Sequence, residues 1–253
     1  MPELPNPVPA LLTAALDRLR GQAGVSPAYL DLRVDLFHAQ VDALEAIPEK
    51  TVFDGEPLWA PALSGDVLPT LLNRVEATLV ARDPGSALPA LFKPFRAEPA
   101  LARTWVGAAS PFDQGTLQSL ATRLDAPFEA LLFFGRILAA PFVHAAIRAG
   151  ARPPTKECAG ACPACGSAPG LAWLEGEEGR LFLGCGVCAA RWSAPRLACP
   201  TCGAEDKLVR LREEEDAPRW IQGCDACQAY IQIVDRRTRK DASPFLPLVE
   251  VIA

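Results

Sequence analysis

Eight of the nine cysteines in this chain fall into four Cys-x-x-Cys pairs, a spacing that indicates metal coordination. Two thiolates separated by two residues can reach one ion from a tight turn, here called a knuckle, while backbone N–H groups point at the sulfurs. A second knuckle from a neighbouring hairpin then completes a tetrahedron of four sulfurs. The four pairs are Cys162/Cys165, Cys185/Cys188, Cys199/Cys202 and Cys224/Cys227. They predict two closed metal sites.

The four pairs form an internal repeat. The segment CPACG at 162–166 returns as CPTCG at 199–203, and GCGVC at 184–188 returns as GCDAC at 223–227. Gly166 and Gly203 follow the second cysteine of a knuckle, where the turn tends to need a positive φ. Gaps of 19 residues (166–184) and 21 residues (203–223) lie close to the usual ribbon spacing. Sequential pairing is the economical prediction, with the first two pairs in one site and the last two in the other. Interleaved pairing is the alternative.

Four thiolates in a tetrahedron suit zinc and a single iron about equally, so the donor set does not distinguish the two metals. Zinc would be the default from the spacing alone. Structural disulfides and a thioredoxin-like dithiol are the competing readings. The dithiol lacks a βαβ context and does not explain four pairs. Cys158 has no counterpart in the repeat. We expect it to be a free thiol, with a substitute metal ligand as the alternative.

The elements that must position these knuckles change in character near residue 151. Before it there is no cysteine, and apolar residues recur at helical steps. Ser26-Pro27 is a typical helix start, with a capping serine and then proline at the first helical position. Further helices are predicted over 8–19, 68–79, near 101–105 and over 127–149, with Gly150 as a left-handed cap of the last one. This part is predicted to be an all-α bundle without a catalytic constellation.

After residue 151 the chain is short-stranded and rich in turns. Strands are predicted over 171–174, 180–183, 207–212, 219–222 and 230–234, with hairpin turns at 175–179 and 213–218. Trp192 and Tyr230 are each expected to pack over a knuckle. The fold class is therefore α+β. We place a helical domain at 1–150, a linker at 151–155, a first β module at 156–198 and a second at 199–253.

Composition excludes several function classes. A net charge of −5 argues against a protein whose main partner is a nucleic acid, and residues 158–253 are close to charge balance. Only two histidines are present, which leaves little material for histidine chemistry. The first residues show no signal-peptide pattern. The apolar segment 126–149 contains Arg136 and is expected to be a buried core helix rather than a membrane span. A cytoplasmic, reducing location is expected, where such cysteines more often bind metal.

The cysteine-rich part resembles a known family. CPACGSAP at 162–169, CGVCAARW at 185–192, Arg196 before Cys199, and CDACQAY at 224–230 together resemble FdhE proteins, which are accessory proteins for the formation of respiratory formate dehydrogenase. The resemblance is close over about 160–250 and general in the helical part. It departs at Gln232, where the family usually has lysine, and in the end of the chain at Ala253, which precedes the usual extension.

The resemblance implies two rubredoxin-like modules after a helical domain, and a cytoplasmic, non-enzymatic role in maturing formate dehydrogenase by binding its catalytic subunit. It also tilts the metal toward iron without deciding between iron and zinc. Two other classes stay open: a rubredoxin-like redox or electron-transfer protein, and a zinc-ribbon nucleic-acid-binding protein. A hydrolytic or transferase enzyme is the least consistent class, because four cysteines leave no open coordination position for a substrate.

Overall fold

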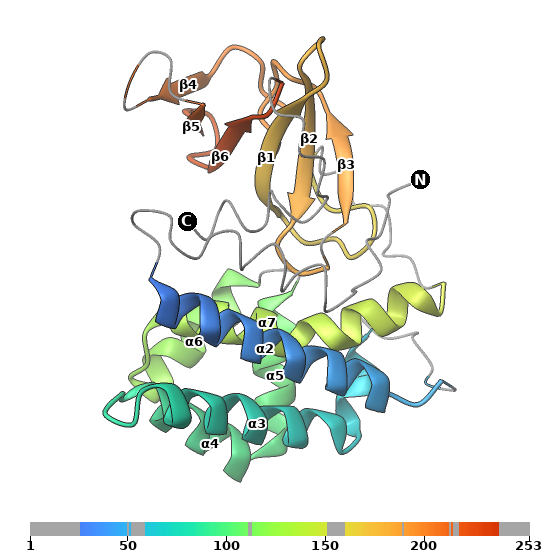
Figure 1. The fold of residues 1–253 in the computed structure, drawn as a ribbon, viewed down its shortest axis with the longest axis vertical. Coiled ribbons are helices and arrows are strands. Elements are labelled where there is room, and N and C mark those ends of the chain that lie inside the picture. Colours follow the sequence, from blue (N-terminus) through green and yellow to red (C-terminus); the bar gives the residue numbers. More distant parts are fainter. Residues whose placement is uncertain are drawn as a thin grey trace. The chain divides into compact units, whose positions relative to one another are not determined.

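The computed structural model describes residues 26–49, 51, 59–110, 113–150, 160–188, 190–212, 214 and 218–237, and it divides the chain into two compact units. The helices lie in one unit and the strands in the other (Figure 1). The helix predicted over 8–19 lies outside the described residues, and so does Cys158. Within the described residues, the predicted change from helices to strands is confirmed.

The helical unit is built from amphipathic segments that share one core. Its elements are α2 (Pro27–Ala46), η1 (Ala60–Ser64), α3 (Val67–Arg82), η2 (Leu88–Phe92), α4 (Lys93–Ala97), α5 (Pro99–Ala109), α6 (Gln114–Leu124) and α7 (Phe128–Arg148). The predicted cap is confirmed, since Ser26 Oγ accepts a hydrogen bond from the backbone N–H of Tyr29. Sequence reasoning missed α6, which Asp113 caps by accepting from the N–H of Thr116 at 3.0 Å.

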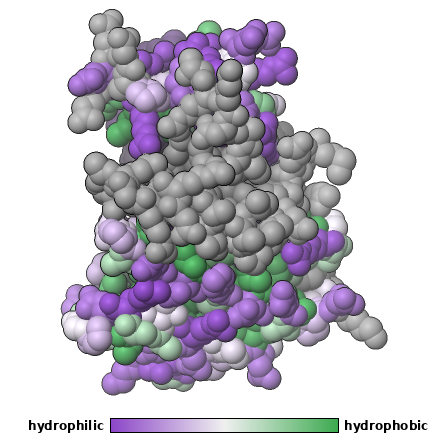
Figure 2. Space-filling view, viewed as in Figure 1, coloured by the Kyte–Doolittle hydropathy of each residue, from purple (hydrophilic) through white to green (hydrophobic). Residues whose placement is uncertain are grey.

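The helix α7 is the centre of this unit. It packs against α2, α5 and α6, and α2 packs in turn against α3 (Figure 1). Among the described helices it is the one that is long and apolar enough to cross a membrane, and 67% of its most apolar window is buried within the structure. That burial favours the predicted core helix. Hydrophilic side chains cover much of the visible face of the helical unit, with apolar residues between them (Figure 2).

Close packing holds α5 against α7. The indole Nε1 of Trp105 donates to the carbonyl of Leu131 at 2.8 Å, and the ring of Phe95 stacks on Trp105 with centroids 4.0 Å apart. Gly135 permits this approach, because a Cβ there would lie 2.6 Å from the Cβ of Ala109 and 2.9 Å from Trp105 Nε1. These contacts bury the tryptophan completely and satisfy its only donor.

The strands of both cysteine repeats form a single six-stranded sheet. They are β1 (Pro169–Glu175), β2 (Arg180–Cys185), β3 (Arg191–Ala194), β4 (Leu208–Leu211), β5 (Arg219–Cys224) and β6 (Tyr230–Asp235), in the order β3-β2-β1-β6-β5-β4. The five predicted strands are confirmed, while β3 was missed. Pairing is antiparallel within each repeat, and β1 and β6 pair in parallel where the repeats meet (Figure 1).

That parallel pair gives the two repeats a common core. Side chains of both repeats pack into one apolar cluster: Ala172, Leu174, Leu181, Leu183, Trp220, Ile231 and Ile233. Trp192 packs against this cluster from β3. The division of the chain at residue 198 into separate modules stays a prediction, and the shared sheet shows that the repeats do not bury their apolar faces independently.

Candidate metal centres

The structure brings the eight predicted cysteines into two groups of four. The first group is Cys162, Cys165, Cys185 and Cys188, and the second group is Cys199, Cys202, Cys224 and Cys227. Within each group all sulfurs lie within 4.8 Å of one another. These are the sets expected from sequential pairing. That all eight hold metal stays a prediction.

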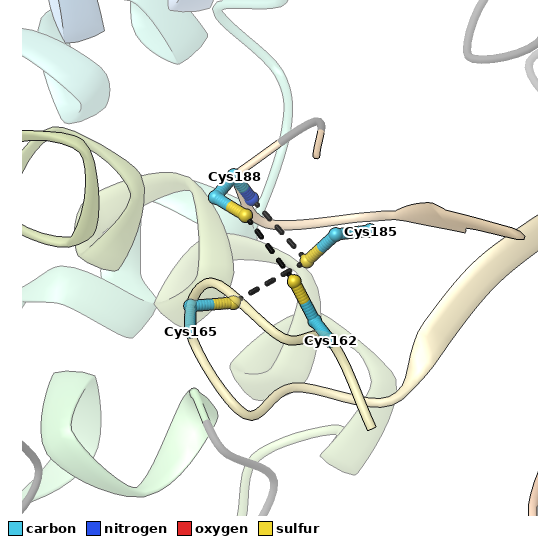
Figure 3. Close-up of side chains that lie close together, drawn as sticks. All are labelled: Cys162, Cys165, Cys185 and Cys188. Atoms are coloured by element: carbon cyan, nitrogen blue, oxygen red, sulfur yellow. Dashed lines mark hydrogen bonds between the residues drawn. The ribbon is translucent and has the colours of Figure 1, made fainter. Parts of the chain in front are cut away.

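Each group joins the knuckle before one strand pair to the knuckle after it. The first group connects the turn before β1 to the turn between β2 and β3, and its four side chains point toward one another (Figure 3). The second group connects the turn before β4 to the turn between β5 and β6. The hairpins therefore set the distance between paired knuckles, which is why the ligand pairs are separated by about twenty residues in the sequence.

The sulfur spacing fits a tetrahedral ion. Sγ of Cys162 lies 3.6 Å from that of Cys188, and Sγ of Cys165 lies 3.4 Å from that of Cys185. In the second group, Cys199 to Cys227 and Cys202 to Cys224 are both 3.7 Å. A tetrahedron with metal–sulfur bonds of about 2.3 Å has edges of about 3.8 Å. Each group could therefore hold one tetrahedral ion with small adjustments. Zinc and iron fit such a donor set equally well.

All four knuckles have the same backbone hydrogen bonding. The N–H of the first cysteine donates to the carbonyl five residues later, at distances between 2.7 and 2.9 Å. The four pairs are Cys162 to Ser167, Cys185 to Ala190, Cys199 to Ala204 and Cys224 to Ala229. The repeat seen in the sequence is therefore a repeat of local structure.

The residue after the second cysteine of a knuckle has the positive φ that the sequence indicated. Gly166 and Gly203 have φ values of 75° and 77°, as predicted from their position after the second cysteine. Gln228 takes the same role in the fourth knuckle with φ of 60°, although it has a side chain. N–H groups also point at sulfur: those of Val187 and Cys188 donate to Cys185 Sγ at 3.4 Å each. Such bonds stabilise a thiolate.

The thiols of each group share protons when no ion balances their charge. Hydrogen bonds from Cys162, and then from Cys185 and Cys188, hold the pKa of Cys165 far below its usual range. Hydrogen bonding to Cys162 and Cys165 raises the pKa of Cys185 and of Cys188 in return. Four sulfurs this close cannot all be thiolates unless a cation lies among them.

In the second group, too, the pKa of one thiol is lowered and that of another is raised. Burial opposes ionisation of Cys199, but the N–H groups of Cys202 and Thr201 lower the pKa of this thiol to about 7. Although the N–H of Ala229 acts in the opposite direction, burial and the neighbouring thiols raise the pKa of Cys227 to about 12. A bound cation would favour the thiolate form of all four cysteines and so release their protons.

Sequence reasoning missed one contact between the two groups. Gly160 lies two residues before the first knuckle, and a Cβ at this position would overlap the backbone carbonyl of Pro200 in the third knuckle. The chain segment that leads into the first knuckle is thus packed against the third knuckle, which belongs to the second group. The sequence signal for this close contact was the glycine just before the first knuckle.

The expected aromatic cover is wrong for Tyr230, whose side chain is 79% exposed. The register explains the error. Leu183 pairs with Trp192, and the equivalent residue of β5, Gln222, pairs with Ile231. The structural counterpart of Trp192 is therefore buried Ile231, and Tyr230 corresponds to Arg191.

Comparison with known proteins supports the resemblance found in the sequence. The chain is 38% identical over 90 residues to a protein named FdhE homolog from Aquifex aeolicus (strain VF5), covering 34% of this chain and 32% of that protein. It is 30% identical over 76 residues to a protein of the same name from Edwardsiella ictaluri (strain 93-146), covering 29% of this chain and 25% of that protein. These matches thus span about a third or less of either relative. No family model matches the chain.

The fold resembles that of a solved FdhE structure over nearly the whole chain. The crystal structure of the FdhE protein from Pseudomonas aeruginosa matches with a TM-score of 0.58 at 22% identity, covering 99% of this chain and 92% of that one. The α+β class with two zinc-ribbon-like, four-cysteine modules is confirmed by this likeness and by the two cysteine groups. The resemblance to the FdhE family is likewise confirmed.

Proposed function

We propose that this FdhE-like chain is a non-enzymatic accessory factor that acts in the cytoplasm on the catalytic subunit of a respiratory formate dehydrogenase during its maturation. The observation that carries the proposal is the pair of four-cysteine groups on an FdhE-like fold. The link to formate dehydrogenase comes from the family resemblance alone.

The site geometry supports a binding role over catalysis. Each group places four sulfurs around one point, so an ion held there would have no open coordination position for a substrate. When bound, zinc would act as a structural staple, and iron could in addition carry one electron. The chain's own contribution is to hold the knuckles rigid through their repeated hydrogen bonds, so that the sheet unit presents a defined surface to another protein.

The proposal is tested by co-purification with a tagged catalytic subunit of formate dehydrogenase. We expect the wild-type chain to be recovered with the subunit, and Cys224→Ser to be recovered much less. Cys158→Ser is the matched control, because it makes the same chemical change outside both groups. In a strain that lacks this protein, formate oxidation should be lost while molybdenum cofactor synthesis continues. Full formate dehydrogenase activity in that strain would refute the assignment.

An electron-transfer role is the second candidate. The exposure of Cys202 favours it, because an electron must reach an ion close to the surface. Iron in the isolated protein with a reversible one-electron reduction would support this role. A chain isolated with zinc alone would exclude it.

A further inference from the structure

The two repeats can be compared residue by residue, because their strand registers match. Gly184 pairs with Arg191 in the first repeat, and Gly223 pairs with Tyr230 in the second. The knuckles match as well, since each shows the same hydrogen bond from its first cysteine. Differences in exposure between matched positions therefore report on the surroundings of each group and not on its local fold.

The first group is enclosed. Cys162, Cys185 and Cys188 are buried, and Cys165 is partly buried. Four of the residues between and after these cysteines are buried too: Ala164, Ser167, Val187 and Ala190. A ligand from solution has little access to these sulfurs.

The second group is open at the matched positions. Cys202 is exposed where its counterpart Cys165 is partly buried, and Cys227 is partly buried where its counterpart Cys188 is buried. The four positions matching the buried residues of the first group are all more exposed: Thr201, Ala204, Ala226 and Ala229. Pro200 is the exception, being buried where Pro163 is exposed, and it is the residue that meets Gly160.

The strand face beside each group shows the same contrast. In the first repeat Leu171 and Trp173 are buried, and the guanidinium of Arg191 lies 4.3 Å from the ring centroid of Phe182. In the second repeat the matched apolar residues are exposed: Val209, Leu211, Ile221 and, in place of Arg191, Tyr230. An apolar face is thus covered beside the first group and bare beside the second.

We propose that the two groups differ in function: the first is a buried structural site, and the second is an exchange site whose ion is available to a competing thiolate or chelating ligand. Cys202 is the sulfur that such a ligand reaches first. The bare apolar face beside it leaves room for a ligand-bearing molecule to approach. This inference rests on the metal binding in the proposed function, and it assigns delivery or acceptance of an ion to the second group alone.

The test is metal release from the full chain loaded with two Zn²⁺ ions, measured with an excess of a chromophoric chelator. We expect two phases of equal amplitude. Differences in the surroundings of metal ligands typically change affinity about 10- to 100-fold, so the fast phase should be at least roughly tenfold faster than the slow one. Cys202→Ser should remove the fast phase and keep the slow one. The matched variant Cys165→Ser should do the reverse.

A second measurement covers the case in which Cys165→Ser fails to fold. The zinc-loaded wild-type chain is treated briefly with iodoacetamide, and the modified cysteines are mapped by mass spectrometry. Among the eight grouped cysteines, Cys202 should be alkylated first. Release in a single phase, or earlier alkylation of any first-group cysteine, would overturn the inference while leaving the proposed function intact. A chain that binds no zinc or iron would instead overturn the metal-binding basis of both.

Discussion

Gln40 is expected to complete a hydrogen bond that Pro141 removes from α7. A proline within a helix has no N–H to donate to the carbonyl four residues earlier, which in α7 is the carbonyl of Ile137. The side-chain Nε2 of Gln40, on α2, donates to this carbonyl at 2.8 Å. The bond links two residues 97 positions apart in the sequence. It therefore ties α2 to the middle of the core helix.

Gln40→Leu is expected to lower the unfolding free energy, because it leaves the carbonyl of Ile137 without a hydrogen-bond donor. Leucine keeps a similar volume, so the packing of this partly buried position changes little. The carbonyl of buried Ile137, however, loses its partner. Leaving a buried acceptor unsatisfied costs about 1–3 kcal/mol, and we expect a loss of unfolding free energy in that range.

A double-mutant cycle isolates this bond. Pro141→Ala restores an N–H that can donate to Ile137, so Gln40→Leu in that background should cost less than about 0.5 kcal/mol. Stability is measured by urea unfolding of the full chain, followed by far-ultraviolet circular dichroism. Gln118→Leu on the exposed face of α6 is the control and should be nearly neutral. Equal costs of Gln40→Leu with Pro141 and with Ala at position 141 would refute the reasoning.

Three further predictions concern the sites and the packing that supports the fold. Removing both ions with a chelator should unfold the sheet unit and leave the helical unit folded, because structural ions supply on the order of 10 kcal/mol. Limited proteolysis checks this, and full resistance of residues 160–235 in metal-free protein would contradict it. Metal affinity should fall as pH falls, because the pKa values of Cys185, Cys188 and Cys227 are raised and a binding ion must displace their protons. With at least one proton displaced, the Zn²⁺ affinity measured by titration should fall about tenfold or more for each pH unit lowered. An affinity that does not depend on pH would show that the thiols are already ionised. Gly135→Ala should destabilise the helical unit by about 1–3 kcal/mol, because the added Cβ would collide with Ala109 and Trp105. The control is Gly107→Ala in α5, where a Cβ meets open space, and it should be neutral or stabilising by up to about 1 kcal/mol. Equal shifts of the melting temperature in the two variants would disprove the steric argument.

The sequence by itself determined the features that depend on neighbouring residues. The Cys-x-x-Cys spacing, the glycines after two of the knuckles and the hairpin lengths are local constraints, and they were enough to predict both groups of four. The cap at Ser26 and the apolar stripe of α3 are local as well. Such patterns can be read from one sequence because the atoms that interact lie within a few residues or one hairpin of each other.

Only the tertiary structure decided how these local pieces share a core. The parallel pairing of β1 with β6 joins strands about sixty residues apart, and no turn motif specifies it. The short strand β3 and its register, which make Ile231 the counterpart of Trp192, also depend on the sheet that receives it. The bond from Gln40 to Ile137 depends on the approach of two helices in the same way.

The unequal exposure of the two cysteine groups is likewise a property of the folded chain. Their knuckle sequences are nearly interchangeable, and their local hydrogen bonds are the same. What separates Cys165 from exposed Cys202 is the set of groups packed around each one. Burial depends on residues distant in the sequence, and for that reason the repeat predicted two four-cysteine groups but not the difference in exposure between them.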